Sequence, residues 1–266
     1  MARPFLKWAG GKSQLLYEIM KHVPLRYNQY VEPFVGGGAM FFALKPNKAI
    51  LSDSNSELIN TYKEVRDNVE ELIKLLSTYV NDKAFFLERR SKNPMELSEI
   101  ERAARFLYLN KTCYSGLYRV NSKNEFNVPF GDYKNPNICD KGNLKLASRA
   151  LQGVDLQATY WQNVFNSELV SEGDFVYLDP PYLPVAENSF VAYSKKGFGL
   201  EDHEQLANAF DTLSERGAKI ILSNSDIPWC RDRYSGYKII EVAARRSINS
   251  NGKGRGKVGE LLIRNY

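Results

Sequence analysis

The sequence is poor in the residues that hold metals and disulfides. Its 266 residues include two histidines, His22 and His203, and three cysteines. Cys113, Cys139 and Cys230 form no CxxC pair, and no group of Cys and His has the spacing of a zinc site. An odd number of scattered cysteines is typical of reduced thiols, so we expect a cytoplasmic protein without a bound metal.

Long apolar stretches are also missing. No run of about 18 apolar residues could span a membrane, and the N-terminus lacks the apolar region of a secretory signal. The composition, 43% hydrophobic and 25% charged, is ordinary for a globular protein. The formal net charge of +5 is mildly basic and is by itself weak evidence for a polyanionic partner.

Short strands recur in both end regions of the chain. Runs of strand-forming residues lie at 30–35, 48–53, 175–179, 218–224, 238–244 and 260–264. Helical patterns lie between several of them, for example at 14–23 and 202–216. Strands that alternate with helices predict an α/β fold with a mostly parallel sheet.

The alternation stops between about residues 56 and 145. An apolar stripe there predicts one long helix, whose packing face carries Leu58, Tyr62, Val65, Val69, Leu72 and Leu76. A second helix is expected at 98–110. The stretch GLYRVNSKNEFNVPFGDY, residues 116–133, has two alternating runs around a polar tip and predicts a β-hairpin. We interpret the region as a helical insertion capped by a hairpin.

The first strand runs into a turn of three glycines in VEPFVGGGAMFF. Glycine lets the backbone turn sharply and approach a ligand closely, although many such turns are merely structural. The second strand ends in Asp53, seventeen positions after Gly36. A lone Asp at a strand end is usually a helix cap, but an acid at that offset from a glycine turn also binds ribose. Together the two features favour a nucleoside cofactor.

The glycine pattern excludes the common phosphate-binding motifs. Position 41 is Phe, so the GxGxxG spacing of dinucleotide sites is absent. GGKS at 10–13 resembles the end of a P-loop, but position 6 is Leu where that motif needs glycine. A cofactor without phosphates fits better, and S-adenosyl-L-methionine is the candidate.

The sequence VYLDPPYLPV, residues 176–185, predicts a stiff corner at the end of a strand, because proline ends a strand. One interpretation is purely structural: Asp179 caps a turn in a proline-rich loop. The functional one is that Asp179 and the Pro180 carbonyl accept the two hydrogens of an adenine amino group, whose lone pair is otherwise delocalised. Tyr182 could then stack on a base swung out of the duplex, which is worth about 1–3 kcal/mol.

Taken in order, these blocks resemble the Dam-type DNA adenine-N6 methyltransferases of the D12 class. The similar segments are FLKWAGGK, EPFVGGG, SDSNSELI, FLYLNKTCYSGLYR, NEFNVPFGDYK, DPPY and RRSINSNG, and they span nearly the whole chain. The resemblance implies a Rossmann-like mixed sheet with an inserted helical and β-hairpin DNA-recognition domain.

The resemblance also implies roles for single residues. The catalytic residues would be Asp179, Pro180 and Tyr182. S-adenosyl-L-methionine would contact Trp8, Lys12, Phe34, Gly36, Gly38, Asp53 and Asp179. In YWQNVF, residues 160–165, we expect Asn163 and Phe165 to line the pocket of its adenine ring. DNA would contact Lys7, Tyr114, Ser115, Leu117, Arg119, Pro129 and Lys134, with Tyr114 pushing into the base stack and Arg119 reading guanine.

The chain departs from the family pattern at two places. Ser115 stands where some relatives carry Asn, and Asp132 stands where many carry a basic residue. An acid beside a phosphate would repel it, and Lys134 would compensate. A further DNA contact is expected from the basic, glycine-rich stretch 245–257, which carries Arg245, Arg246, Lys253, Arg255 and Lys257.

We therefore predict an enzyme that methylates N6 of adenine in double-stranded DNA, with base flipping, within GATC. Residues 1–55 and 145–266 would form the catalytic domain and residues 56–144 the target-recognition domain. The product would be S-adenosyl-L-homocysteine, and we expect no metal, no membrane and a monomer in solution. The alternatives are an RNA or small-molecule N-methyltransferase and a nonenzymatic DNA-binding module.

Overall fold

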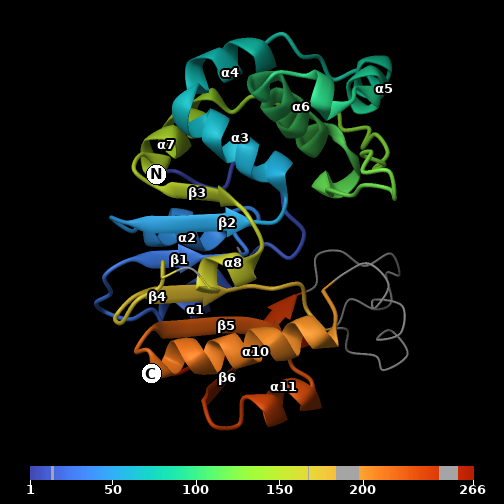
Figure 1. Cartoon of the computed structure of the whole chain (residues 1–266). Helices are drawn as coiled ribbons and strands as arrows, with labels where there is room; N and C mark the ends of the chain where they lie inside the picture. The colour runs from blue at the N-terminus through green and yellow to red at the C-terminus, as the bar shows by residue number, and fades with distance from the viewer. Residues whose placement is uncertain (13–14, 167, 184–197, 246–256) are drawn as a thin grey trace. The chain divides into compact units, whose positions relative to one another are not determined.

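The protein has a mixed α/β fold with a seven-stranded sheet (Figure 1). The computed structural model describes residues 1–12, 15–166, 168–183, 198–245 and 257–266. The strand order is β3-β2-β1-β4-β5-β7-β6. The strands are β1 Tyr30–Glu32, β2 Ala49–Asp53, β3 Asp155–Ala158, β4 Phe175–Leu178, β5 Lys219–Ser225, β6 Lys238–Arg245 and β7 Lys257–Arg264. The mixed sheet predicted from the sequence is thus confirmed.

The helices occupy the intervening segments. They are α1 Leu16–Met20, α2 Ala39–Leu44, α3 Ser56–Asp67, α4 Val69–Leu76, α5 Lys83–Ser91, α6 Glu99–Thr112, α7 Lys141–Leu151, α8 Trp161–Asn166, α10 Leu200–Glu215 and α11 Pro228–Arg233. Short 3₁₀ turns lie at Pro94–Glu96 and Tyr114–Gly116. The strand β3 and the helices α5, α7, α8 and α11 had not been predicted.

Packing divides the chain into two compact units. The first unit contains Met1–Gly11, Val35–Lys45 and Ser52–Thr159, and the second contains Lys12–Phe34, Pro46–Leu51 and Tyr160–Tyr266. These are units of packing. The predicted division by function, residues 1–55 with 145–266 and residues 56–144, stays a prediction.

In the second unit, β1, β4 and β5 are parallel, and β5 pairs antiparallel with β7. All four residues of β4 are buried, as expected for a central strand covered on both faces. The apolar side of α10 packs on this sheet through Leu206, Phe210 and Leu213, and Figure 1 shows α10 running along β5. This core fixes the point at which β4 ends and the segment with Asp179 begins.

In the first unit, the helices α3, α4, α6 and α7 pack together. Asn55 caps the start of helix α3, because its side chain accepts the backbone N–H groups of Glu57 and Leu58, both at 3.1 Å. Ser98 caps the start of helix α6, and its N–H donates to Glu101 Oε2 at 2.9 Å. These caps explain why the helices start where they do.

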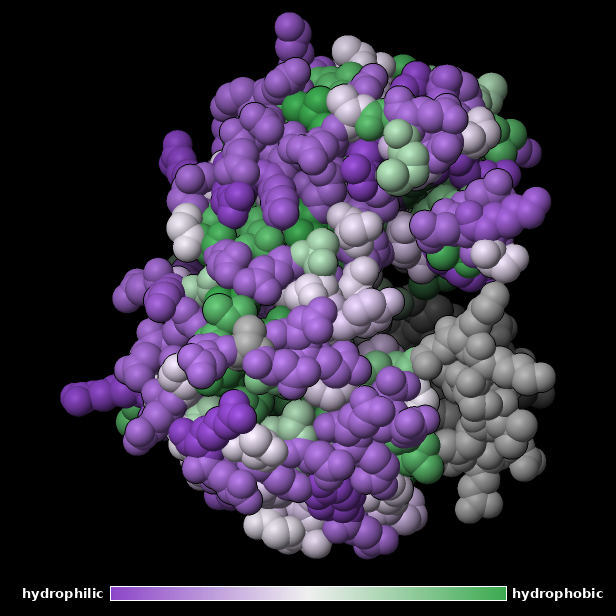
Figure 2. All heavy atoms as spheres, in the orientation of Figure 1, coloured by the Kyte–Doolittle hydropathy of each residue, from purple (hydrophilic) through white to green (hydrophobic). Residues whose placement is uncertain are grey.

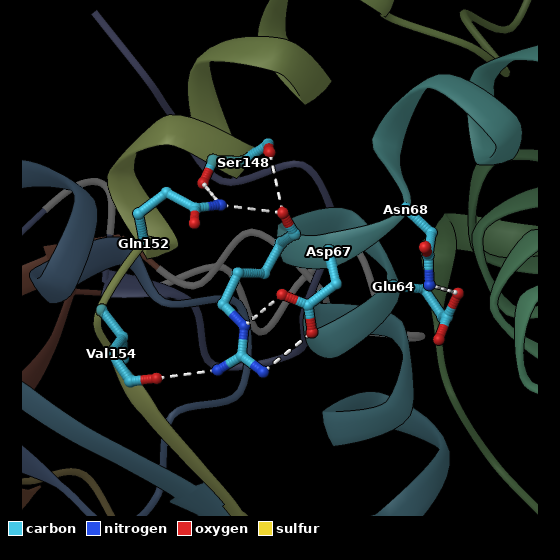
Figure 3. A network of polar contacts seen from close by, with 7 residues as sticks. Glu64, Asp67, Asn68, Ser148, Gln152 and Val154 are labelled. Carbon is cyan, nitrogen blue, oxygen red and sulfur yellow. Dashed lines mark hydrogen bonds and ion pairs between the residues drawn. The ribbon is translucent and has the colours of Figure 1, made fainter.

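The prediction of one long helix across residues 58–76 was wrong, because the helix breaks at Asn68. The Arg66 carbonyl accepts hydrogen bonds from the Ser148 hydroxyl and the Gln152 amide instead of from the next turn of helix, and Figure 3 shows these two side chains near Asp67 at the end of α3. The Arg66 guanidinium donates to the Val154 carbonyl at 2.8 Å. The side chain of Asn68 bonds back to Glu64 at 2.9 Å. Residues more than 80 positions away therefore end α3.

The predicted hairpin at 116–133 is also only partly right. Isolated antiparallel bridges join Val120 to Phe126 and Cys113 to Phe130, but the segment has no regular strand. The Asn121 side chain accepts the N–H groups of Lys123 and Glu125 and so builds the turn. The chain reverses direction here through side-chain bonds at the tip rather than through a full ladder.

The described surface is mostly hydrophilic on the face shown in Figure 2. Within the described ranges, none of the helices is long and apolar enough to cross a membrane.

Candidate active site

The corner after β4 brings Asp179 and Lys12 together in the second unit. Lys12 Nζ lies 2.7 Å from Asp179 Oδ1, and the side chains are 6% and 19% exposed. Burial raises the pKa of the Asp179 carboxyl, and the ammonium of Lys12 opposes that shift. The carboxylate is thus held in place by a charged partner, and its remaining lone pairs can still accept hydrogen bonds.

The rest of the corner is anchored to the antiparallel pair β5–β7. Pro180 is buried and Pro181 exposed. The Tyr182 hydroxyl donates to Glu260 Oε2 at 2.9 Å, and Lys12 Nζ lies 4.5 Å from the centre of the Tyr182 ring. The Ser225 hydroxyl donates to the Leu183 carbonyl at 2.8 Å. The corner predicted from the two prolines is therefore also fixed by bonds from neighbouring strands.

Other predicted cofactor contacts lie elsewhere in the second unit. Phe34 is half-buried and meets Phe198 edge to face, with 5.7 Å between ring centres. Phe165 is 6% exposed and packs beside Trp161 in the hydrophobic core. Asn163 is exposed on the same helix α8. Phe165 therefore has a packing role that accounts for its burial.

The glycine turn and Asp53 lie together in the first unit. The backbone at Gly36 has φ +46°, and its N–H donates to Asp53 Oδ2 at 3.1 Å. Asp53 Oδ1 accepts the N–H of Asn55 at 2.9 Å. Burial raises the pKa of the Asp53 carboxyl, while these two backbone donors oppose the shift. Asp53 thus fixes the turn, and each of its oxygens keeps a lone pair for a ribose hydroxyl.

Trp8 lies directly against this turn. A Cβ at Gly36 would be 2.6 Å from Trp8 Cδ1, so a larger residue would displace the indole. The Trp8 ring stacks on Tyr118, with ring centres 6.0 Å apart. Gly38, with φ +68°, faces the Tyr62 hydroxyl, which donates to the Gly36 carbonyl at 3.0 Å. The glycines therefore leave room for Trp8 and Tyr62 against the turn, and contact of Trp8, Gly36, Gly38 and Asp53 with S-adenosyl-L-methionine stays a prediction.

Several predicted DNA contacts are neighbours in the first unit. Asn110 Oδ1 accepts the Lys7 N–H at 2.9 Å, and Asn110 Nδ2 donates to the carbonyls of Lys7 and Gly116 at 2.7 and 3.0 Å. Lys7 Nζ lies 4.5 Å from the centre of the Tyr133 ring. The Tyr133 hydroxyl accepts the Ser115 N–H at 2.9 Å. Asn110 and Tyr133 therefore join the Lys7 segment to the 3₁₀ turn Tyr114–Gly116.

The predicted base-reading residues follow this turn. Tyr114 is 58% exposed, and its N–H donates to the carbonyl of Pro129, which is also exposed. Leu117 is half-buried. Arg119 is exposed, and its Nε donates to Asn127 Oδ1 at 2.7 Å. The guanidinium of Arg119 is thus held by a neighbour in the same turn segment.

The two departures from the family pattern both have a left-handed backbone. Ser115 has φ +55° and Asp132 has φ +51°. Asn and Asp adopt this conformation more readily than other non-glycine residues, so the backbone suits Asp132 better than it suits Ser115. Lys134, the predicted compensating cation, is exposed. Most of the basic stretch 245–257 lies outside the described residues.

Sequence reasoning missed four residues that organise these clusters, namely Glu260, Tyr62, Asn110 and Tyr133. Each reads as an ordinary residue of a strand, helix or loop, and its partner is distant in the sequence. Across the described ranges, no group of His, Cys, Asp and Glu has the arrangement of a metal site.

Comparison with known proteins gives consistent matches over nearly the full length. A family model described as D12 class N6 adenine-specific DNA methyltransferase matches residues 8–248. The type II methyltransferase M1.LlaDCHI of Lactococcus lactis subsp. cremoris is 43% identical, over 99% of this chain and 95% of that protein. The type II methyltransferase M.MjaIII of Methanocaldococcus jannaschii is 42% identical, over 99% of each. The DNA adenine methylase of Escherichia coli (strain K12) is 37% identical, over 98% and 94%.

Proposed function

The chain belongs to the D12 class of N6 adenine-specific DNA methyltransferases, and we propose that it methylates N6 of adenine within GATC in double-stranded DNA. S-adenosyl-L-methionine would be the methyl donor and S-adenosyl-L-homocysteine the product. The observation that carries the chemistry is the Asp179 carboxylate, held by Lys12 directly after the buried strand β4.

Asp179 would act on the amino group of the target adenine. The lone pair of that nitrogen is delocalised into the ring, so the amine is a poor nucleophile. The Asp179 carboxylate accepts one amino hydrogen and the Pro180 carbonyl accepts the other, which draws the nitrogen toward a tetrahedral geometry. Because both acceptors are fixed before substrate binds, no reorganisation is needed during the reaction. With the methyl donor bound, the nitrogen would form a new N–C bond to the methyl group as the C–S bond breaks, S-adenosyl-L-homocysteine would be the leaving group, and the cationic nitrogen would then lose its proton to solvent.

The target base must first leave the duplex, because its amino group is otherwise paired. Tyr182 would stack on the flipped adenine next to Asp179. Stacking on an aromatic ring is worth about 1–3 kcal/mol per base and offsets part of the cost of flipping. The exposed ring of Tyr114 would enter the space that the base leaves.

The methyl donor would be held by Trp8, Lys12, Phe34, Gly36, Gly38, Asp53, Asn163 and Phe165. When bound, it supplies an electrophilic methyl group. Asp53 supports this assignment, because it fixes the glycine turn and has lone pairs left for a ribose.

The sequence read by the enzyme would depend on Arg119, Leu117 and Pro129, with Lys7, Ser115 and Lys134 as further DNA contacts. Arg119 is the reader with the strongest physical basis, because a guanidinium can donate two hydrogen bonds to guanine. The exposure of Arg119 and Pro129 supports this proposal.

The test is transfer of labelled methyl groups from S-adenosyl-L-methionine to duplexes with and without GATC, followed by sequencing that locates N6-methyladenine. Wild-type protein should methylate the GATC duplex and not RNA. Asp179→Ala should abolish transfer, with duplex binding largely intact. Asp179→Asn keeps the shape of the side chain and should also be inactive. Transfer at the wild-type rate by either folded variant would remove Asp179 from the mechanism.

A further inference from the structure

The ring of Tyr182 is fixed at its hydroxyl as well as at one face. The hydroxyl donates to Glu260 Oε2 at 2.9 Å, while Lys12 Nζ lies 4.5 Å from the ring centre. Burial raises the pKa of Tyr182 well above its ordinary value, and Asp179 and Glu260 add to this shift. The phenol therefore stays protonated at neutral pH and remains a donor to Glu260.

Glu260 is itself rigidly placed. It lies on β7 opposite Ser225 of β5, in the antiparallel pair. Ser225 holds the next residue of the corner, because its hydroxyl donates to the Leu183 carbonyl at 2.8 Å. Ser225 and Glu260, which lie opposite each other in the sheet, thus form hydrogen bonds with two consecutive residues of the corner, Leu183 and Tyr182. The orientation of the ring is tied to the sheet rather than left to the loop.

We propose that Glu260 is a positioning residue, which orients the Tyr182 ring for stacking on the flipped adenine. This inference rests on the proposed function, because it assumes that Tyr182 receives the base. Glu260 would not touch the substrate and would act through the hydroxyl of Tyr182. Without that bond, the ring can turn away from the position in which it covers the base.

The test is a double-mutant cycle of Glu260→Ala and Tyr182→Phe, measured by methylation kinetics on a GATC duplex. Either single change removes the same hydrogen bond, so each should lower kcat/KM by about tenfold. The double variant should be no worse than either single one. Glu260→Gln keeps an acceptor oxygen and should recover most of the activity. Glu241→Ala is the matched control, since Glu241 is a strand carboxylate that bonds Arg231 instead.

A second readout separates positioning from a general loss of stability. A duplex with 2-aminopurine at the target position brightens when that base leaves the stack, and the fluorescence is quenched again when the flipped base stacks on an aromatic ring. Glu260→Ala should raise the fluorescence of the bound duplex, because Tyr182 no longer covers the flipped base, while the melting temperature shows the variant to be folded. Multiplicative losses in the double variant, or an unchanged fluorescence signal in Glu260→Ala, would overturn the proposal. Failure of the proposed function itself would be distinct, because the wild-type protein would then methylate no adenine.

Discussion

Lys12 Nζ and Asp179 Oδ1 lie 2.7 Å apart, so the carboxylate proposed to hold the target amine already has a cationic partner. Both side chains are largely buried. An opposite charge at this distance favours the ionised form of a carboxyl group, against the desolvation that disfavours it. Lys12 therefore helps to keep Asp179 able to accept hydrogen bonds.

The first prediction concerns the pH dependence of methylation. Lys12→Met removes the charge that lowers the pKa of Asp179, so this pKa should rise. Activity requires the ionised carboxylate, and the acid limb of the pH–rate profile should move to higher pH. Lys12→Arg keeps the charge and should leave the limb near its wild-type position. The profiles are measured at saturating S-adenosyl-L-methionine, and an acid limb that Lys12→Met does not move would contradict the assigned role.

The second prediction compares two glycines that both have positive φ. Gly38→Ala would place a Cβ 2.6 Å from the Tyr62 hydroxyl at φ +68°, whereas Gly153→Ala has φ +74° and nothing within 4 Å. Gly153→Ala should cost roughly 1–2 kcal/mol from backbone strain alone. Gly38→Ala should cost about 1–3 kcal/mol more, because Tyr62 must also move. Urea unfolding measures the free energy of unfolding of both variants. Equal losses of stability would contradict the prediction, because they would show that Tyr62 moves away from the new Cβ at no cost.

The third prediction compares two asparagines that bond the N-terminal segment in the same way. Asn110 bonds the N–H and the carbonyl of Lys7, and Asn143 bonds those of Arg3, both at 3.0 Å. Alanine at either position should lower the unfolding free energy by roughly 1–3 kcal/mol. Asn110→Ala alone should also weaken duplex binding severalfold, because it frees the Lys7 segment from Gly116. If both variants bind the DNA duplex equally well, Asn110 has no role in positioning the DNA contacts.

The fourth prediction concerns sequence choice. Arg119→Ala should relax discrimination at one base pair of the site by roughly 1–3 kcal/mol, because a bidentate contact to guanine would be lost. Arg119→Lys keeps the charge but not the planar fork, so it should restore binding more than specificity. Methylation of duplexes with single substitutions in GATC measures both effects. If the substrate preference of Arg119→Ala matches that of wild type, another residue reads that base.

Local sequence signals were enough for part of this structure. The buried run before Asp179 predicted β4, and the two prolines predicted where it ends. The break at Asn68 could not be predicted, because the side chains of Ser148 and Gln152 cause it and the apolar stripe continues across it. The role of Glu260 was hidden for the same reason, since an acid in a strand carries no sign of the tyrosine 78 positions before it. Turn chemistry at Asn121 likewise replaced the regular ladder that alternation predicts.

The contact of Trp8 with the glycine turn has a practical consequence. The chain has three tryptophans, and Trp161 and Trp229 belong to the other packing unit. Replacing those two with phenylalanine would leave one indole, in van der Waals reach of Gly36 and stacked on Tyr118. The intrinsic fluorescence of Trp8 would then report on changes at that turn, and it could be followed by stopped-flow without attaching any dye.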